Sequence, residues 1–447
     1  AYEIGVRLVG SEMCIRDRHT ASHFRTLIMD TRKNASFSFE QERKKIRRSF
    51  TIMVKTGGPI CNLDCDYCYY LEKEALYPGK HPTLPFFKMP DNVLEKLIRE
   101  YILSQPQEQI EFVWHGGEPA LLGVEYFRKI LDIQKKQADG KKILNAFQTN
   151  GTLIDEEWAN FLAENHFLCG LSIDGPKKYH DNHRRYPNGK GSWDKAMECV
   201  KLFQKYGVEF NTMSVVNASN SKQPALVYNF LKSIGSRFMQ FTPIVERIAL
   251  DETEPLSIVD NRYSKATAVM NENVNATDWG NFLCRIFDIW VKKDVGTHFI
   301  NYFDNTLAAY AGQQPSLCSM AEYCGCSLAI EHNGDTYCCD HFVFPEYNVG
   351  NIMTTPISEM AKSDKQLFFE QHKKDTLARQ CQACEYLAAC GGDCPKNRFV
   401  KNEDGEYISY LCEGFKMFFR HTRKHFEFMA DELRHHRAPA NIMNQKG

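Results

Sequence analysis

The segment from Cys61 to Tyr70, which reads CNLDCDYCYY, constrains the fold and chemistry of this chain most strongly. It holds three cysteines, Cys61, Cys65 and Cys68, in the spacing C-x3-C-x2-C, directly after the apolar run 49–56. Thiolates bind zinc or iron–sulfur clusters, and a four-iron cluster takes four ligands. Three cysteines in one loop would therefore leave one iron open to a substrate or cofactor. The alternative is a zinc loop, although zinc sites more often add a second, distant cysteine pair.

Length, charge and cysteine content narrow the class of protein. The chain has 447 residues, 43% of them hydrophobic, which is enough for a large core and more than one domain. Its net charge of −1 offers no overall field to attract nucleic acid or an anionic membrane. We see no membrane-spanning run and no export segment, so we expect a cytoplasmic protein. In that compartment, 17 cysteines that are partly clustered indicate metal sites rather than disulfides.

Short apolar runs alternate with amphipathic stretches from residue 49 to about residue 250. The predicted strands are 50–55, 109–114, 143–148, 167–173, 208–216 and 238–244. The predicted helices between them are one capped by Asp91, then 124–137, 155–165, 192–206 and 224–234. Six such units predict an α/β fold with a parallel sheet, and they are too few for a closed eight-stranded barrel. We therefore expect a partial (β/α)6 barrel, with its chemistry at the carboxyl ends of the strands.

Candidate binding residues follow several of these strands. The sequence HGGEP at 115–119 follows the second strand, and its adjacent glycines would let backbone approach a ligand, although a tight turn also explains them. Ser172 ends the fourth strand, where its hydroxyl could contact a ribose or carboxylate or cap a helix instead. Arg184 could pair bidentately with a carboxylate or form a surface ion pair.

A second group of cysteines lies beyond residue 302. Three of them have the spacing C-x5-C-x14-C, four more have the spacing C-x2-C-x5-C-x3-C, and one follows alone. They are Cys318, Cys324, Cys339, Cys381, Cys384, Cys390, Cys394 and Cys412. Eight thiols suit two four-cysteine sites, which could hold iron–sulfur clusters or structural zinc. Asn333 and Gly334 predict a two-residue hairpin turn that would bring Cys324 and Cys339 together.

Several motifs together resemble one known family. The cysteine loop is similar to the signature of radical S-adenosylmethionine (SAM) enzymes, and the second cysteine group resembles their SPASM extension. The runs CNLDCDYCYYLEK, HGGEPALLG, QTNGTLID, LSIDGP, CDHFVFPEYNVGNI and CGGDCPKNR resemble the anaerobic sulfatase-maturating enzymes. This resemblance covers nearly everything from Ser49 to the end of the chain.

The resemblance implies a reaction and its cofactors. One Cys or Ser of a sulfatase would be oxidised to Cα-formylglycine through a 5'-deoxyadenosyl radical made from SAM. It implies three 4Fe-4S clusters. The SAM-binding cluster would be held by Cys61, Cys65 and Cys68. One auxiliary cluster would be held by Cys318, Cys324, Cys339 and Cys394, and the other by Cys381, Cys384, Cys390 and Cys412.

The resemblance also implies residue roles at the SAM site. The residues expected to contact SAM are Tyr67, Tyr70, Gly116, Ser172, Arg184 and Val245. Tyr70 would stack on adenine, Arg184 would pair with the SAM carboxylate, and Val245 would form an apolar wall. Asp340, directly after Cys339, would be the catalytic base. A structural aspartate that hydrogen-bonds its loop is the alternative, and spacing alone does not exclude His341 as the base.

The expected partners are an unfolded or nascent sulfatase with the motif C/S-x-P-x-R and a low-potential electron donor such as flavodoxin or ferredoxin. No nucleic acid or membrane partner is expected.

We divide the chain into a leader at 1–48, expected to be artefactual or disordered in its first part, and a barrel at 49–250. A connecting loop and helix at 251–301 and a SPASM domain at 302–447 follow, with a helix at 415–433 packed over the second auxiliary cluster.

Two other functions share some of these features. Another SPASM peptide maturase, which forms thioether crosslinks or decarboxylates a peptide, would carry the same clusters. A zinc-binding interaction protein without catalysis would carry the cysteines but no iron.

Overall fold

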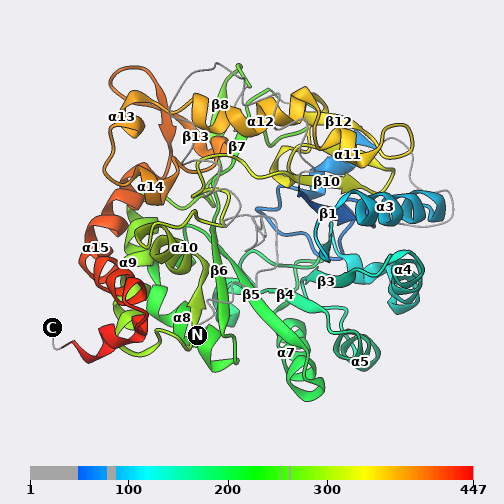
Figure 1. The fold of residues 1–447 in the computed structure, drawn as a ribbon, viewed down its shortest axis with the longest axis horizontal. Helices are drawn as coiled ribbons and strands as arrows, with labels where there is room; N and C mark the ends of the chain where they lie inside the picture. Colours follow the sequence, from blue (N-terminus) through cyan, green and yellow to red (C-terminus); the bar gives the residue numbers. More distant parts are fainter. Residues whose placement is uncertain (1–48, 78–86, 252, 261–262, 446–447) are drawn as a thin grey trace.

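The centre of the molecule is a curved, open sheet of ten strands with the order β12-β11-β10-β1-β2-β3-β4-β5-β6-β9 (Figure 1). It is seen in a computed structural model that describes residues 49–77, 87–251, 253–260 and 263–445. The predicted leader at 1–48 lies outside the described residues. Strands β12 and β9 form the two edges, so the sheet does not close into a barrel.

The six predicted strands form the middle of this sheet, in sequence order and all parallel. They are β1 (Thr51–Lys55), β2 (Gln109–His115), β3 (Lys142–Thr149), β4 (Leu168–Ser172), β5 (Glu209–Val216) and β6 (Phe238–Pro243). Each begins and ends within one residue of the predicted bounds. The partial (β/α)6 architecture expected from the alternating pattern is therefore confirmed.

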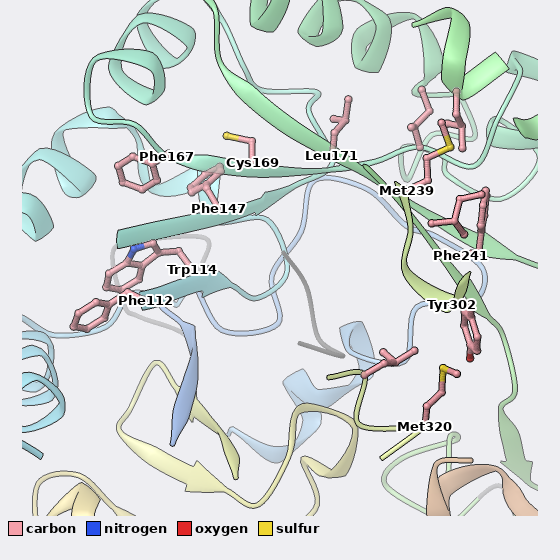
Figure 2. Packing of buried hydrophobic residues seen from close by; sticks show 14 of the residues in the cluster. Phe112, Trp114, Phe147, Phe167, Cys169, Leu171, Met239, Phe241, Tyr302 and Met320 are labelled. Carbon is pink, nitrogen blue, oxygen red and sulfur yellow. The ribbon is translucent and has the colours of Figure 1, made fainter. Parts of the chain in front are cut away.

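The helices between the strands form an outer layer around the curved sheet (Figure 1). They are α3 (Asp91–Ser104), α4 (Val124–Gln137), α5 (Glu156–Glu164), α7 (Trp193–Tyr206) and α8 (Pro224–Ser233). Large side chains of the strands fill the space beneath them. Phe112 and Trp114 stack with ring centroids 5.5 Å apart, and Phe147 of the neighbouring strand lies beside them (Figure 2). On the opposite face of the same strands, Met53 and Val113 belong to a small separate cluster.

The predicted helix cap at Asp91 is wrong. Asp91 is the first residue of α3, and the cap position is Pro90, whose extended backbone precedes the helix without a side-chain hydrogen bond. Helix α9 (Ala276–Lys293) is capped by Asn275, whose side-chain oxygen accepts a hydrogen bond from the Asp278 backbone N–H.

The second cysteine region joins the barrel sheet, which the sequence did not predict. Strand β10 (Ser327–Glu331) pairs in parallel with β1, on the side opposite β2. Strands β11 (Asp335–Tyr337) and β12 (Asn348–Asn351) continue the sheet in antiparallel order. The predicted hairpin exists, but its turn spans residues 332–334 rather than two residues, with Gly334 at a φ of 89°.

Smaller elements complete the described chain. The weakly patterned stretch after β6 contains the hairpin of β7 (Arg247–Ala249) and β8 (Thr267–Val269). Another hairpin, β13 (Arg398–Lys401) with β14 (Tyr407–Ser409), precedes the last long helix. The remaining elements include β9 (Phe299–Ile300), α10 (Asn301–Tyr310) and α12 (Asp364–Asp375). Of the helices described, none is long and apolar enough to cross a membrane.

The last long helix, α15 (Cys412–Arg434), crosses α9 at two glycines. A Cβ added at Gly280 would lie 2.8 Å from the Gly414 carbonyl oxygen, and one added at Gly414 would lie 2.1 Å from the Ala276 carbonyl oxygen. The backbones of the two helices are therefore in contact at this crossing. Away from it, aromatic rings such as Phe287 and Phe426 pack between the helices, with centroids 5.1 Å apart.

We predict that Gly414→Ala destabilises the protein, because the added methyl group must push α15 away from α9. Overpacking of this kind costs about 1–3 kcal/mol. The midpoint of thermal unfolding should fall accordingly, and Lys424→Ala on the exposed face of the same helix should leave it almost unchanged. An unchanged midpoint for Gly414→Ala would mean that the two helices need not approach so closely.

Candidate functional site

The HGGEP turn after β2 holds the start of the cysteine loop after β1. The backbone N–H of Gly117 donates to the Gly58 carbonyl oxygen (2.9 Å), and that of Glu118 donates to the Ile60 carbonyl oxygen (3.0 Å). A Cβ at Gly117 would lie 2.0 Å from the Ile60 oxygen. Gly116 has a φ of 136°, a conformation that favours glycine. The motif is thus a tight turn that also braces the cysteine loop.

The end of β3 contributes a second brace through Glu118. The Glu118 carboxylate accepts hydrogen bonds from the Asn150 backbone N–H (2.7 Å) and the Thr149 hydroxyl (2.9 Å). The Asn150 side-chain nitrogen in turn donates to the Asn62 carbonyl (3.0 Å) and lies 3.6 Å from Cys61 Sγ. Burial raises the pKa of Glu118 to about 7. The ends of β1, β2 and β3 therefore hold the cysteine loop in place.

The three loop thiols are free and partly buried at this edge of the sheet. Burial is the main cause that raises the pKa of each thiol, to about 12 for Cys65. Cys65 and Cys68 each add to this rise at Cys61, so the thiols lie within electrostatic range of one another. Among the described residues, no group of three or more His, Cys, Asp or Glu side chains is arranged to hold a single metal ion.

A buried cluster of polar side chains lies beside the loop, after β4. The Arg184 guanidinium donates to both oxygens of the Asp174 carboxylate (3.0 and 3.2 Å), and the Tyr67 hydroxyl donates to the same carboxylate. Asp174 is fully buried and Arg184 is 9% exposed, so a surface ion pair is excluded. Asp174 was missed by sequence reasoning, although its place at the end of the fourth strand could have indicated it.

The other residues expected to contact SAM lie at the same edge of the sheet, and their contacts with SAM stay a prediction. The Tyr70 hydroxyl donates to the Glu331 carboxylate (2.7 Å), and the ring lies under the Lys55 ammonium. Ser172 Oγ accepts from Gln148 (3.1 Å) and caps no helix, since the following helix begins after Pro176. Val245 is buried just beyond β6.

Asp340 follows Cys339 in a short 3-10 turn and is 3% exposed. Its carboxylate contacts the Lys55 ammonium at the end of β1 and accepts a hydrogen bond from the Tyr69 hydroxyl. Burial alone would raise the pKa of this carboxyl, but the nearby Lys55 ammonium and His115 hold that pKa below its usual range. Lys55 was also missed by sequence reasoning. Its position, at the end of a strand of otherwise apolar residues, could have indicated that this lysine belongs to the site.

His341, the other residue considered as a base, packs its ring against Tyr69 with centroids 5.0 Å apart. Burial lowers the pKa of His341. Its Nδ1 is buried and has no hydrogen-bond partner among the residues that the structure describes. The structure therefore places Asp340, and not His341, in contact with the Lys55 ammonium.

Four of the later cysteines line one cavity. They are Cys381, Cys384, Cys390 and Cys412, and the cavity wall also contains Tyr386, Phe415 and Phe419. Cys412 begins α15, and the two phenylalanines follow on the same helix. The helix therefore covers this cysteine set, as expected. An enclosed space lined by four thiols fits the donor set of an iron–sulfur cluster.

The other four cysteines are connected through an apolar cluster and a lysine. Cys324, Cys339 and Cys394 pack against one apolar cluster that contains Phe342 and Phe369. Cys318 is joined to them through Lys373, which donates to the Cys318 carbonyl oxygen and interacts with the thiols of Cys318, Cys324 and Cys394. The grouping of these eight cysteines into two sets of four is therefore compatible with the structure.

Comparison with known proteins identifies the family. Residues 56–231 match the Radical SAM superfamily, and residues 318–385 match the SPASM iron–sulfur cluster-binding domain. The chain is 47% identical over 393 residues to a serine-type anaerobic sulfatase-maturating enzyme of Bacteroides thetaiotaomicron, an alignment that covers 88% of this chain and 94% of the relative. It belongs to the anaerobic sulfatase-maturating enzymes. The family resemblance noted in the sequence is confirmed.

Other members of the family are more distant. A cysteine-type anaerobic sulfatase-maturating enzyme of Clostridium novyi is 31% identical, with 86% of this chain and 98% of the relative aligned. The solved structure of anSMEcpe with bound AdoMet and Cp18Cys peptide superimposes with a TM-score of 0.74 at 31% identity, over 86% of this chain and 99% of that one. SuiB of Streptococcus suis bound to S-adenosylmethionine, at 15% identity and a TM-score of 0.55 over 88% of this chain and 87% of that one, shares the fold.

We predict that Gly117→Ala prevents the maturating enzyme from retaining the cluster of its first cysteine loop. The methyl group cannot fit against the Ile60 carbonyl, so the loop must move away from the β2 turn. Iron per chain, measured after anaerobic reconstitution, should fall from about twelve to about eight. Gly57→Ala is the matched control, since its Cβ would make ordinary contacts at 3.9 Å. Full iron content in Gly117→Ala would contradict this role of the turn.

Proposed function

We propose that this chain oxidises a Ser or Cys side chain of an extended sulfatase peptide to Cα-formylglycine, with Asp340 as the base. The observation that carries the proposal is the position of Asp340. Its buried carboxylate lies at the edge of the sheet where the cysteine loop and the candidate SAM-binding residues also lie. Membership of the sulfatase-maturating family supplies the reaction class.

The donor sets fit the cofactors of this family. The loop presents three thiols, and the two later sets present four each, one of them around a shared cavity. Cys61, Cys65 and Cys68 would hold the cluster that binds SAM, and the two sets of four would hold the auxiliary clusters. When bound, SAM and the clusters would supply radical chemistry at the substrate Cβ and a route for the second electron.

The protein's own part is to position the substrate and to remove a proton. Lys55 contacts one oxygen of Asp340 and the Tyr69 hydroxyl contacts the other, so the carboxylate has a fixed orientation. A carboxylate offers about four lone-pair sites, and therefore retains capacity to accept the substrate hydroxyl or thiol proton. The Lys55 ammonium stabilises the ionised form of Asp340. The ionised carboxylate is the form that can accept a proton from the substrate.

The surrounding residues support SAM binding at the same edge. Arg184 and Tyr67 are held together by Asp174, while Ser172 ends β4 and Gly116 follows β2 at the same edge of the sheet. We propose that these side chains, with Tyr70 and Val245, form the SAM site. A low-potential donor such as flavodoxin or ferredoxin would supply the first electron.

The relatives favour serine as the modified residue. The Bacteroides relative is named serine-type and is 47% identical, whereas the Clostridium novyi relative is named cysteine-type and is 31% identical. We expect the reconstituted enzyme, given SAM and a reductant, to convert a peptide with S-x-P-x-R faster than its C-x-P-x-R counterpart. Mass spectrometry of both peptides checks this.

The same assay separates the competing functions. Crosslinked or decarboxylated peptide would indicate another SPASM maturase. SAM turnover with both sulfatase peptides left unmodified would also argue against formylglycine formation. A colourless, zinc-containing protein after reconstitution would end the enzyme assignment.

We predict that Asp340→Asn retains SAM cleavage but forms formylglycine at least about 100-fold more slowly, since a general base typically contributes that much. Deoxyadenosine and product are quantified in the same reaction. Asp132→Asn, an exposed change on α4, serves as the control. Unaltered product formation by Asp340→Asn would remove this residue from the mechanism.

A further inference from the structure

A buried lysine lies beside one of the two auxiliary cysteine sets. Lys373, in the last turn of α12, is fully buried. Its Nζ donates to the carbonyl oxygens of Cys318 (2.5 Å), Ser319 (2.8 Å) and Ala321. A lysine ammonium has three protons, and here each has its own acceptor. These three acceptors stabilise the ammonium form of Lys373 against burial, which lowers its pKa, and no carboxylate is among them.

A buried arginine provides a second positive charge, between Lys373 and the other cysteine set. Arg398, at the start of β13, is 6% exposed and donates to the carbonyl oxygens of Gly392 (2.7 Å), Asp393 (3.1 Å) and Lys373 (2.5 Å). Gly392 and Asp393 lie between Cys390 of one set and Cys394 of the other. Arg398 therefore holds the segment that joins the two sets, and it is linked directly to the helix that carries Lys373.

The two cations act on overlapping groups of thiols. Lys373 interacts electrostatically with the thiols of Cys318, Cys324 and Cys394, which all belong to the first auxiliary set. Arg398 interacts with Cys324 of that set and with Cys381 of the second set. Lys373 therefore acts on the first set, whereas Arg398 acts on thiols of both sets.

Two buried carboxylates lie near these cations. Glu370, one turn before Lys373, is fully buried and interacts with the Cys324 thiol. The Asp393 carboxylate accepts from the Cys394 backbone N–H (2.6 Å) and the Ser409 hydroxyl (2.7 Å). Two buried cations therefore face two buried carboxylates here. Loss of either cation would remove one positive charge from beside the thiols.

We infer that Lys373 sets the reduction potential of the auxiliary cluster held by Cys318, Cys324, Cys339 and Cys394, with Arg398 acting on both auxiliary clusters. This inference rests on the ligand sets of the proposed function. A cluster gains one unit of negative charge when it accepts one electron, which in this reaction would come from the oxidised substrate. A fixed positive charge in a buried, weakly screened site favours that reduced form. Lys373 therefore makes the cluster a better electron acceptor.

The test is a potentiometric titration of the reconstituted holoenzyme, followed by electron paramagnetic resonance in the absence of SAM and peptide. Lys373→Met retains most of the side-chain volume and removes the charge. At a fixed potential the ratio of reduced to oxidised cluster should fall about tenfold, equivalent to about 59 mV for a one-electron couple. Lys374→Met is the matched control, because this neighbouring lysine is 43% exposed and pairs with Glu322 at the surface.

Two further variants keep the inference testable if Lys373→Met fails to assemble its cluster. Glu370→Gln retains the shape and the hydrogen bond from Gln366, removes a negative charge, and should shift the potential in the positive direction. Lys373→Arg retains the charge and should stay near the wild-type potential. An unchanged potential in an iron-replete Lys373→Met protein, or no positive shift in Glu370→Gln, would overturn the inference.

The outcome is independent of the peptide assay. If the potentials shift as expected but no formylglycine forms, the inference survives and the proposed substrate is wrong. If formylglycine forms and the potentials do not move, Lys373 only holds the Cys318–Ala321 backbone in place.

Discussion

The site depends on the parallel pairing of β1 with strands on both sides. In that register Lys55 lies opposite His115 of β2 and Glu331 of β10. Because parallel strands end at the same edge of a sheet, the cysteine loop, the glycine turn and the second cysteine region all meet there. Asp340 reaches Lys55 only because the β10–β11 hairpin brings it to the end of β1. The contact between Asp340 and Lys55 is therefore a consequence of strand order.

Buried charges are the second constraint on this edge of the sheet. Removing an ion from water costs several kcal/mol unless it is paired or fully hydrogen-bonded. Asp340 is compensated by Lys55 and Tyr69, Asp174 by Arg184 and Tyr67, and Lys373 by three carbonyl oxygens. Each group is satisfied by residues distant in sequence. Loss of one partner from the Asp340 or Asp174 pair would leave an unpaired charge in the interior, so those positions tolerate little change.

Most of the barrel was predictable, because each central strand is a short apolar run followed by a helix with a clear period. The strand at 327–331 was not recognised, since nothing local shows that it pairs with β1 rather than forming a separate sheet. The turn at Gly334 was recognised, but its length was not, because Asn-Gly also occurs in longer turns. Cysteine spacing indicated the metal sites. Lys55 and Lys373 were missed because a charged residue inside an element normally faces solvent, and here each faces inward. Asp174 was missed because it lies in the loop just beyond β4, where a carboxylate is normally exposed.

The pairing of β1 with β10 also bears on synthesis of the chain. Strand β1 is made early, whereas β10 lies in the C-terminal third of the sequence. On the ribosome, one edge of β1 therefore has no partner until most of the polypeptide has emerged, and an open edge can pair with other chains. The thiols of the first loop leave the ribosome under the same conditions. This edge of β1 is therefore covered only once the segment 327–331 has been made.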